Sequence, residues 1–226
     1  MYSENYDVAR KKYFNDFLDK KKPKFFIEII DRFKPKTCLD VGSGNGLFSL
    51  EMCNHFKSFV GIEVSDRICF AKKYLRQSGK KNIRFIRGDA RKMSFDDNSF
   101  DLVYCTGVVE HIPDVDDAIK EIARVSKKYV LIDTPTWRWE VYHFFKFWLW
   151  VITHPVYVVK RTFEKVKTEN ATVGGLAKKS WNEAHINKWN ISKWRSVFQK
   201  NGVKIVDEKI INFGMTYVVL GVKDNK

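Results

Sequence analysis

The segment TCLDVGSGNGLFSLEM, residues 37–52, places three glycines within five residues directly after a short apolar run. The run at residues 37–41 predicts a β-strand, and residues 47–55 predict a helix that begins at the glycines. At the carboxyl end of a parallel strand, a helix N-terminus directs free N–H groups into the crevice where such sheets bind ligands. The segment therefore indicates a ligand that approaches the backbone closely, with a tight structural turn as the alternative.

The glycine spacing limits the kind of ligand. Dinucleotide sites carry G-x-G-x-x-G and phosphate loops end in Lys-Ser/Thr, whereas Gly42, Gly44 and Gly46 follow G-x-G-x-G without such an ending. Three acidic residues are predicted at strand ends on the same edge of the sheet: Asp40, Glu63 and Asp89. A carboxylate ending the second strand can accept hydrogen bonds from both ribose hydroxyls, and one ending the third can accept from an adenine amine. These residues predict an adenosine ligand that carries no diphosphate.

Strand and helix patterns alternate through most of the chain. Beyond residues 37–41, strands are predicted at residues 59–64, 83–86, 100–105, 129–132, 203–211 and 215–222. Helices are predicted at residues 66–77, 115–125 and 192–200, and two more between residues 6 and 33, separated by the lysine cluster around Pro23. This alternation predicts an α/β fold with a Rossmann-like, doubly wound sheet of seven strands.

Four parts of the chain are expected. Residues 1–34 form N-terminal helices, in which Tyr6 and Tyr13 either contribute to a lid over the ligand or simply pack. Residues 35–136 form the cofactor-binding core. Residues 137–190 form an aromatic and basic insertion, and residues 191–226 complete the sheet.

Composition places weaker limits on function. The chain has 226 residues and a net charge of +14, which favours an anionic partner such as RNA, an acidic membrane or a phosphorylated substrate, or else reflects lysines spread over a solvated surface. The four cysteines, Cys38, Cys53, Cys69 and Cys105, form no C-x-x-C pair and have no clustered histidines near them. They predict buried thiols in a reducing compartment and no metal site. The N-terminal residues carry no apolar signal core, so a cytoplasmic protein is expected.

Four motifs in order resemble those of the class I S-adenosylmethionine-dependent methyltransferases: LDVGSGNG, VGIEVS, IRFIRGDARKMSF and FDLVYCTGVVEHIPD. The resemblance covers about residues 36–135. VVEHIPD and the later HINKWNISKWRSVFQKNGVKIV are most similar to the small-molecule branch that includes ubiquinone- and menaquinone-pathway enzymes. The resemblance implies S-adenosylmethionine as the cofactor and a mostly parallel sheet with an antiparallel C-terminal strand.

The resemblance also implies roles for individual residues. The methionine portion of the cofactor would be surrounded by Asp40, Gly42, Ser43 and Gly44. Glu63, followed by Val64, binds the ribose, and Asp89 with Ala90 frames the adenine. Thr106, Gly107 and Val108 lie beside the sulfonium, and Gly46 supports close packing at the helix entry. The alternatives are that Asp40 caps a helix and that Glu63 and Asp89 are ordinary strand-end carboxylates.

A methyl group on a sulfonium already has a good leaving group, so the enzyme has chiefly to align the nucleophile and exclude water, which can supply ~7–11 kcal/mol. An acceptor that carries a proton also needs a base. His111 lies just past the fourth predicted strand, and its ordinary pKa of about 6.5 suits that task. Glu110 and His185 are further candidates for this role. His111 and Glu110 could equally be structural residues, and for His185 a hydrogen-bonded structural role is the favoured interpretation.

Residues 141–159, VYHFFKFWLWVITHPVYVV, are apolar at nearly every position. As a helix the part before Pro155 covers only ~20 Å of a ~30 Å hydrocarbon core, so a membrane span is not expected. Lys160, Arg161, Lys165 and Lys167 follow and favour an anionic surface. The stretch therefore predicts a lid that touches a membrane and admits a hydrophobic or lipid-like acceptor, or alternatively a packed insertion or dimer interface.

Three functions follow from these patterns. The first is methyl transfer to a small, hydrophobic acceptor. The second is RNA methylation on the basic surface, which is weaker because no separate nucleic-acid module is visible. The third is a non-catalytic cofactor-binding protein.

Overall fold

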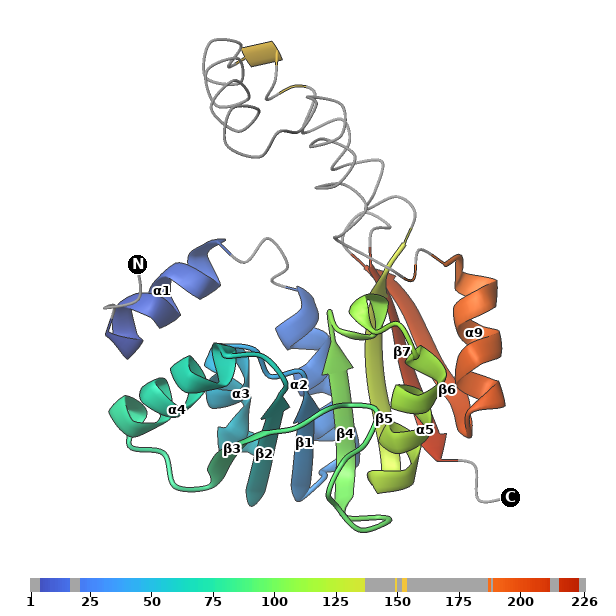
Figure 1. The fold of residues 1–226 in the computed structure, drawn as a ribbon, viewed down its shortest axis with the longest axis horizontal. Helices are drawn as coiled ribbons and strands as arrows, with labels where there is room; N and C mark the ends of the chain where they lie inside the picture. The colour runs from blue at the N-terminus through green and yellow to red at the C-terminus, as the bar shows by residue number, and fades with distance from the viewer. Residues whose placement is uncertain are drawn as a thin grey trace, which may run out of the picture.

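The computed structural model describes residues 5–16, 21–136, 149, 152, 153, 187, 189–211 and 216–223. Within these residues seven strands form one sheet in the order β3-β2-β1-β4-β5-β7-β6 (Figure 1). The strands are β1 (Thr37–Val41), β2 (Ser58–Glu63), β3 (Ile83–Arg87), β4 (Phe100–Thr106), β5 (Ser126–Pro135), β6 (Val203–Ile211) and β7 (Thr216–Lys223). Strands β1 to β5 pair in parallel, and β7 is antiparallel to both β5 and β6. The predicted fold is confirmed, including the antiparallel C-terminal strand.

Helices cover both faces of the sheet. They are α1 (Tyr6–Asp16), α2 (Lys21–Phe33), α3 (Leu47–Met52), α4 (Arg67–Ser78), α5 (Val115–Val125) and α9 (Ile191–Lys200), with short 3-10 turns η1 (Cys53–His55) and η2 (Val109–His111). One hydrophobic core joins helices α1 to α4 to the sheet, and a second joins α5 and α9 to the other face. No helix in the described residues is long and apolar enough to cross a membrane.

The apolar spacing explains why α5 forms where it does. Its buried residues Val115, Ala118, Ile119, Ile122 and Val125 recur every three or four positions, which places them on one face against the sheet. Strand β5 begins directly after Val125, three residues earlier than predicted from the apolar run at residues 129–132. The exposed pair Lys127-Lys128 interrupts the apolar pattern at the start of the strand, so the sequence does not mark it.

Two expectations for the chain outside the site need correction. The two predicted N-terminal helices are present as α1 and α2, but Pro23 does not lie between them; it lies in the first turn of α2, where a missing N–H costs no helical hydrogen bond. Cys69 is exposed on α4, whereas Cys38, Cys53 and Cys105 are buried as expected. Its neighbours Ile68 and Ala71 fill the buried face of that helix.

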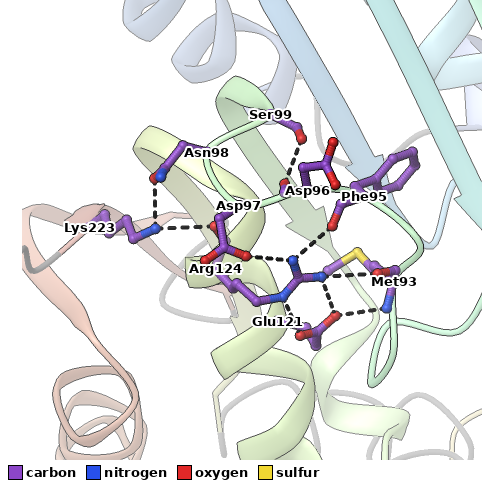
Figure 2. Close-up of polar contacts among 9 residues, drawn as sticks. All are labelled: Met93, Phe95, Asp96, Asp97, Asn98, Ser99, Glu121, Arg124 and Lys223. Carbon is purple, nitrogen blue, oxygen red and sulfur yellow. Dashed lines mark hydrogen bonds and ion pairs between the residues drawn. The ribbon is translucent and has the colours of Figure 1, made fainter.

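A polar network fastens the long loop between β3 and β4 to the end of α5 (Figure 2). The Arg124 guanidinium donates to the Glu121 carboxylate, to Asp97 Oδ1 and to the carbonyl oxygens of Met93 and Phe95, at 2.6–2.9 Å. Glu121 also accepts from the Met93 N–H. Arg124 is the largest cause that holds the pKa of Glu121 below its ordinary value. We call this set of residues the Arg124 staple.

The strand order determines where a ligand can bind. The chain moves from β1 outward to β2 and β3, then crosses to β4 on the other side of β1. Loops that follow β1 and β4 therefore diverge to opposite faces, and the crevice between them is the usual binding position in an open parallel sheet.

Candidate active site

The glycine loop after β1 is held against the end of β2. The N–H groups of Gly42 and Ser43 both donate to the Ile62 carbonyl oxygen, at 2.9 and 2.8 Å. Gly42 has φ +82°, and a Cβ at this position would lie 2.3 Å from Val108 Cγ2 on the loop after β4. A side chain here would therefore close the crevice between the β1 and β4 loops.

Gly46 serves packing rather than the crevice. Its Cβ would lie 2.8 Å from Ala71 Cβ and 2.7 Å from Phe85 Cζ, and its φ of +78° starts α3. It lines neither of the hollows described below. Gly46 is therefore the one predicted cofactor-binding residue that packs against α4 and β3 instead of lining a hollow. This position agrees with the packing role that the resemblance implies.

Glu63 ends β2 with its carboxylate already positioned. Its Oε2 accepts from the Gly44 N–H and its Oε1 from the Ser65 N–H, both at 2.8 Å. A carboxylate oxygen has two acceptor positions, so each retains one for a further donor. Two neighbouring hydroxyl groups of a ribose would match this arrangement.

Asp40 is buried at the end of β1, with 3% of its surface exposed. Its Oδ2 accepts a hydrogen bond from the Ser49 hydroxyl of α3. Burial raises the pKa of Asp40 to about 7, against the lowering effect of the Ser49 and Tyr104 hydroxyls. Near neutral pH the empty site therefore holds Asp40 partly protonated, and a positive group beside it would favour the ionised form.

Asp89, just past β3, is held by Arg91. The Arg91 Nη2 donates to Asp89 Oδ2 at 2.7 Å, and Nη1 donates to Asp114 at 3.1 Å. Hydrogen bonding from Arg91 lowers the pKa of Asp89. Asp89 thus stays charged and fixed at the edge of the crevice, where it lines the larger of the two hollows described below.

The turn after β4 is fixed from two sides. The Gly107 N–H donates to Asp133 Oδ1 at 2.8 Å, which ties the turn to the end of β5. The Asn187 side chain donates to the carbonyl oxygens of Val109 and Ile112, and its N–H donates to the Glu110 carbonyl. Asn187 therefore holds η2 in place.

The two acid–base candidates on η2 differ in environment. Glu110 is buried, with Oε1 3.9 Å from the position that a Cβ on Gly107 would take. His111 is exposed and lines the crevice. Only His111 of these two faces the space where a ligand could lie. His185, the third candidate, lies outside the described residues.

Two adjoining hollows occupy the crevice. The first, about 390 Å³, is lined by Asp40, Gly42, Ser43, Gly44, Asn45, Phe48, Arg67, Phe70, Tyr74, Thr106 and Gly107. The second, about 600 Å³, is lined by Gly42, Gly44, Ile62, Glu63, Val64, Ser65, Arg67, Gly88, Asp89, Ala90, Arg91, Gly107, Val108, His111, Ile112 and Pro113. The structure thus brings the predicted cofactor-binding residues together around one continuous depression, apart from Gly46.

Sequence reasoning missed several residues of this site. Arg67 lines both hollows, and Phe70 and Tyr74 line the first. Their i, i+3, i+7 spacing on α4 was a visible signal of a shared face. Asp133 and Asn187 support the site from strands and loops far along the chain, and no local pattern marks them.

Residues 39–131 match the family described as "Methyltransferase domain". This stretch is a methyltransferase domain. It contains the loop after β1, the three strand-end carboxylates Asp40, Glu63 and Asp89, and the η2 turn.

Relatives are similar in sequence to about two fifths of this chain. An uncharacterized methyltransferase of Bacillus subtilis is 31% identical over 99 residues, which is 42% of this chain and 39% of that protein. The ubiquinone biosynthesis O-methyltransferase of Pelagibacter ubique is 34% identical over 90 residues, which is 40% of this chain and 37% of that protein. The matched part thus spans less than two fifths of these relatives.

Solved structures are similar in fold to a larger part of the chain than the matched domain. A methyltransferase from Aquifex aeolicus described as S-adenosylmethionine-dependent superposes with a TM-score of 0.59 at 14% identity, over 87% of this chain and 88% of that one. The methyltransferase domain here therefore has the Rossmann-like fold of that class.

Proposed function

We propose that the chain transfers a methyl group from S-adenosylmethionine to a small, hydrophobic or lipid-like acceptor by direct in-line displacement. The observation that carries this proposal is the joining of the two hollows at Gly42, Gly44 and Gly107. Glu63 on one side suits a ribose and Asp40 on the other suits an ammonium group, so a single adenosine with an amino-acid side arm accounts for both.

The proposed donor fits what the residues offer. Among the described residues that line the hollows, none forms a Lys-Ser/Thr phosphate-loop ending, and Arg91 is already held by Asp89 and Asp114, which leaves no pair of unengaged cations for a diphosphate. Asp89 and Ala90 would frame the adenine, with exposed Val64 as an apolar wall. The sulfonium would then lie near Thr106, Gly107 and Val108.

The chemical step needs alignment and, for a protonated acceptor, a base. The acceptor's lone pair forms the new bond to the methyl carbon while the bond from carbon to sulfur breaks, and sulfur keeps that electron pair. We assign the departing proton to His111, which lines the larger hollow beside Val108. Glu110 would support the turn, because it is buried behind Gly107.

A hydrophobic acceptor is supported by the insertion. Leu149 and Ile152, which the structure describes within it, are helical and mostly exposed, at 64% and 70%. One matched relative is a ubiquinone biosynthesis O-methyltransferase and another a sterol 24-C-methyltransferase. The lid and membrane contact predicted for residues 137–190 remain part of this proposal.

The test is to incubate the protein with methyl-labelled S-adenosylmethionine and a fractionated cell extract. Label in the lipid-extractable fraction is expected, and Glu63→Ala should abolish it. Label in RNA instead would favour the nucleic-acid alternative. No incorporation into any fraction, despite donor binding, would favour a non-catalytic protein.

A further inference from the structure

Strands β1 to β3 begin at the edge of the sheet opposite the crevice, which is the lower edge in Figure 1. Backbone hydrogen bonds join the segments that enter these strands. The N–H groups of Lys57 and Ser58 donate to the Lys36 carbonyl oxygen at 2.8 and 3.2 Å, and the Phe59 N–H donates to the Asn82 carbonyl oxygen at 2.8 Å. The segments therefore form one continuous strip, which we call the amino-edge surface: residues 34–36, 57–58 and 81–84.

A hollow of about 310 Å³ opens on this surface where β2 and β3 begin. Arg84, Ser58 and Ser94 line it, and their side chains have no hydrogen-bond partner among the described residues. Guanidinium and hydroxyl groups are the donors that commonly bind phosphate oxygens. The hollow therefore offers donors to an anion, and it shares no lining residue with the two hollows of the crevice.

Cations outnumber carboxylates on this surface. Five of its exposed side chains carry a positive charge and take part in no ion pair within the described residues: Lys34, Lys36, Lys57, Lys81 and Arg84. Among the described residues that form the strip or line its hollow, Asp96 alone is acidic. Asp101, close by, is engaged by the N–H groups of Lys36 and Thr37. The surface should therefore attract an anionic partner.

The side chains of this surface fit a nucleic acid better than an acidic protein. Protein interfaces have an apolar or aromatic centre, whereas nucleic-acid interfaces are more polar and more positively charged. None of the large apolar side chains exposed in the described residues lies in the strip or its hollow. Phe95 and Phe100, the aromatic residues of the hollow, pack edge to face on each other with ring centroids 5.0 Å apart. The surface thus offers contacts to phosphates, which carry no sequence information, and no ring for base stacking.

We propose that the amino-edge surface binds the phosphate backbone of a nucleic acid without regard to its sequence. The seven residues of β4 separate this surface from the crevice by roughly 20 Å. The bound nucleic acid is therefore a docking partner and not the methyl acceptor. The membrane contact proposed above belongs to residues 137–190, which contribute none of the side chains of this surface.

Salt-dependent binding of nucleic acid tests the proposal. Fluorescence anisotropy on the whole chain would measure dissociation constants for a short labelled RNA and a short labelled duplex DNA at increasing NaCl concentrations. The test variants are the double substitution Lys57→Ala with Lys81→Ala, and Arg84→Ala. The matched control for the double variant is Lys72→Ala with Lys193→Ala, because these lysines are exposed on α4 and α9 and their loss removes the same charge. Circular dichroism would verify that each variant is folded.

The Lys57→Ala, Lys81→Ala variant should bind both nucleic acids more weakly and lower the slope of log K against log salt concentration by roughly 1–2, because each lost phosphate contact contributes about 0.7–0.9. Arg84→Ala should lower the slope by about half as much, and the control should match the unaltered protein. An equal loss in the control would show diffuse charge attraction and overturn the proposal. Failure of both nucleic acids to bind the unaltered protein would also overturn it, as would tighter binding of polyglutamate or anionic vesicles at the same lysines.

The outcome is independent of the proposed methyl transfer. S-Adenosylhomocysteine affinity, measured by calorimetry, should be the same for the unaltered protein and every variant, because none of the substituted residues lines the crevice. Loss of nucleic-acid binding with normal affinity for this ligand would support a separate site. Parallel loss of both would overturn that separation.

Discussion

The crevice and the Arg124 staple use the same kinds of side chain in opposite ways. In the staple, one guanidinium meets two carboxylates and two backbone carbonyls, and Arg124 holds the pKa of Glu121 low. In the crevice, burial raises the pKa of Asp40 to about 7, and the buried Ser43 Oγ has no hydrogen-bond partner among the described residues.

The difference separates stability from binding. Polar groups that satisfy one another contribute to folding but have little capacity left for a ligand. Polar groups left short of partners cost stability and are tolerated where a ligand supplies the missing contacts. Substitutions in the staple should therefore change the free energy of unfolding, and substitutions in the crevice should change donor affinity or turnover.

The largest expected effect is on turnover at His111. His111→Ala should lower the turnover rate by ~10²–10⁴-fold, because general base catalysis contributes about that much. Donor affinity and thermal stability should change little, since the side chain is exposed. Steady-state kinetics with the acceptor found in the labelling experiment would measure this. Normal turnover would make His111 a structural residue.

Next is donor binding at Glu63. Glu63→Ala should weaken S-adenosylmethionine by ~100-fold or more, because two charge-assisted hydrogen bonds to the ribose are lost at once. Calorimetry would measure the dissociation constant. Glu28→Ala is the control, since Glu28 is an exposed carboxylate on α2 that lines neither hollow. An unchanged constant for Glu63→Ala would remove the ribose assignment.

The staple should show the reverse behaviour. Arg124→Ala should lower the free energy of unfolding by about 1–3 kcal/mol, because it removes the guanidinium that donates to Glu121 and to two loop carbonyls. Urea unfolding would measure this loss. Donor affinity, measured at a temperature where the variant is folded, should stay within a few-fold. If Arg124→Ala greatly weakened donor binding but left the free energy of unfolding unchanged, the proposed difference between the two regions would be wrong.

The smallest effect is the pH dependence of donor binding. Below about pH 7 the empty site holds a proton on Asp40 that the donor's ammonium must displace, so affinity should rise up to about tenfold per pH unit and level off above pH 7. 5′-Methylthioadenosine, which lacks the ammonium, should show no such rise. A flat profile for both ligands would contradict the role of Asp40.

The raised pKa of Asp40 also makes the stability of the fold depend on pH. Donor affinity should rise with pH, whereas this group's contribution to stability should fall. The unfolded chain releases the Asp40 proton near pH 3.8, whereas the folded chain keeps it until about pH 7. This group's contribution to stability is therefore fully present below pH 3.8 and is lost as pH rises toward 7. Asp40→Asn should remove that loss at pH 8 while weakening the donor, since Asn can still accept from Ser49 but carries no charge.

Much of the fold could be predicted because local patterns and tertiary packing agree. The apolar positions of α5 gave its bounds directly, and β6 was predicted at its observed residues. The glycine spacing and the strand-end positions of Glu63 and Asp89 predicted that these residues share a crevice, since parallel strands end at one edge.

What could not be predicted depends on contacts between distant segments. Asn187 reaches Val109 and Ile112, 78 and 75 positions away, and Asp133 reaches Gly107 across neighbouring strands. The burial that raises the pKa of Asp40 likewise comes from packed elements around β1. The expectation that Cys69 is buried was wrong because the outward side of an amphipathic helix also carries occasional apolar residues.

The most direct test of the central claim is a crystal structure with S-adenosylhomocysteine bound. The account predicts the nucleoside in the larger hollow with both ribose hydroxyls on the Glu63 carboxylate, and the amino-acid arm in the smaller hollow with its ammonium at Asp40. A nucleoside bound outside both hollows, or one whose ribose does not contact Glu63, would contradict it.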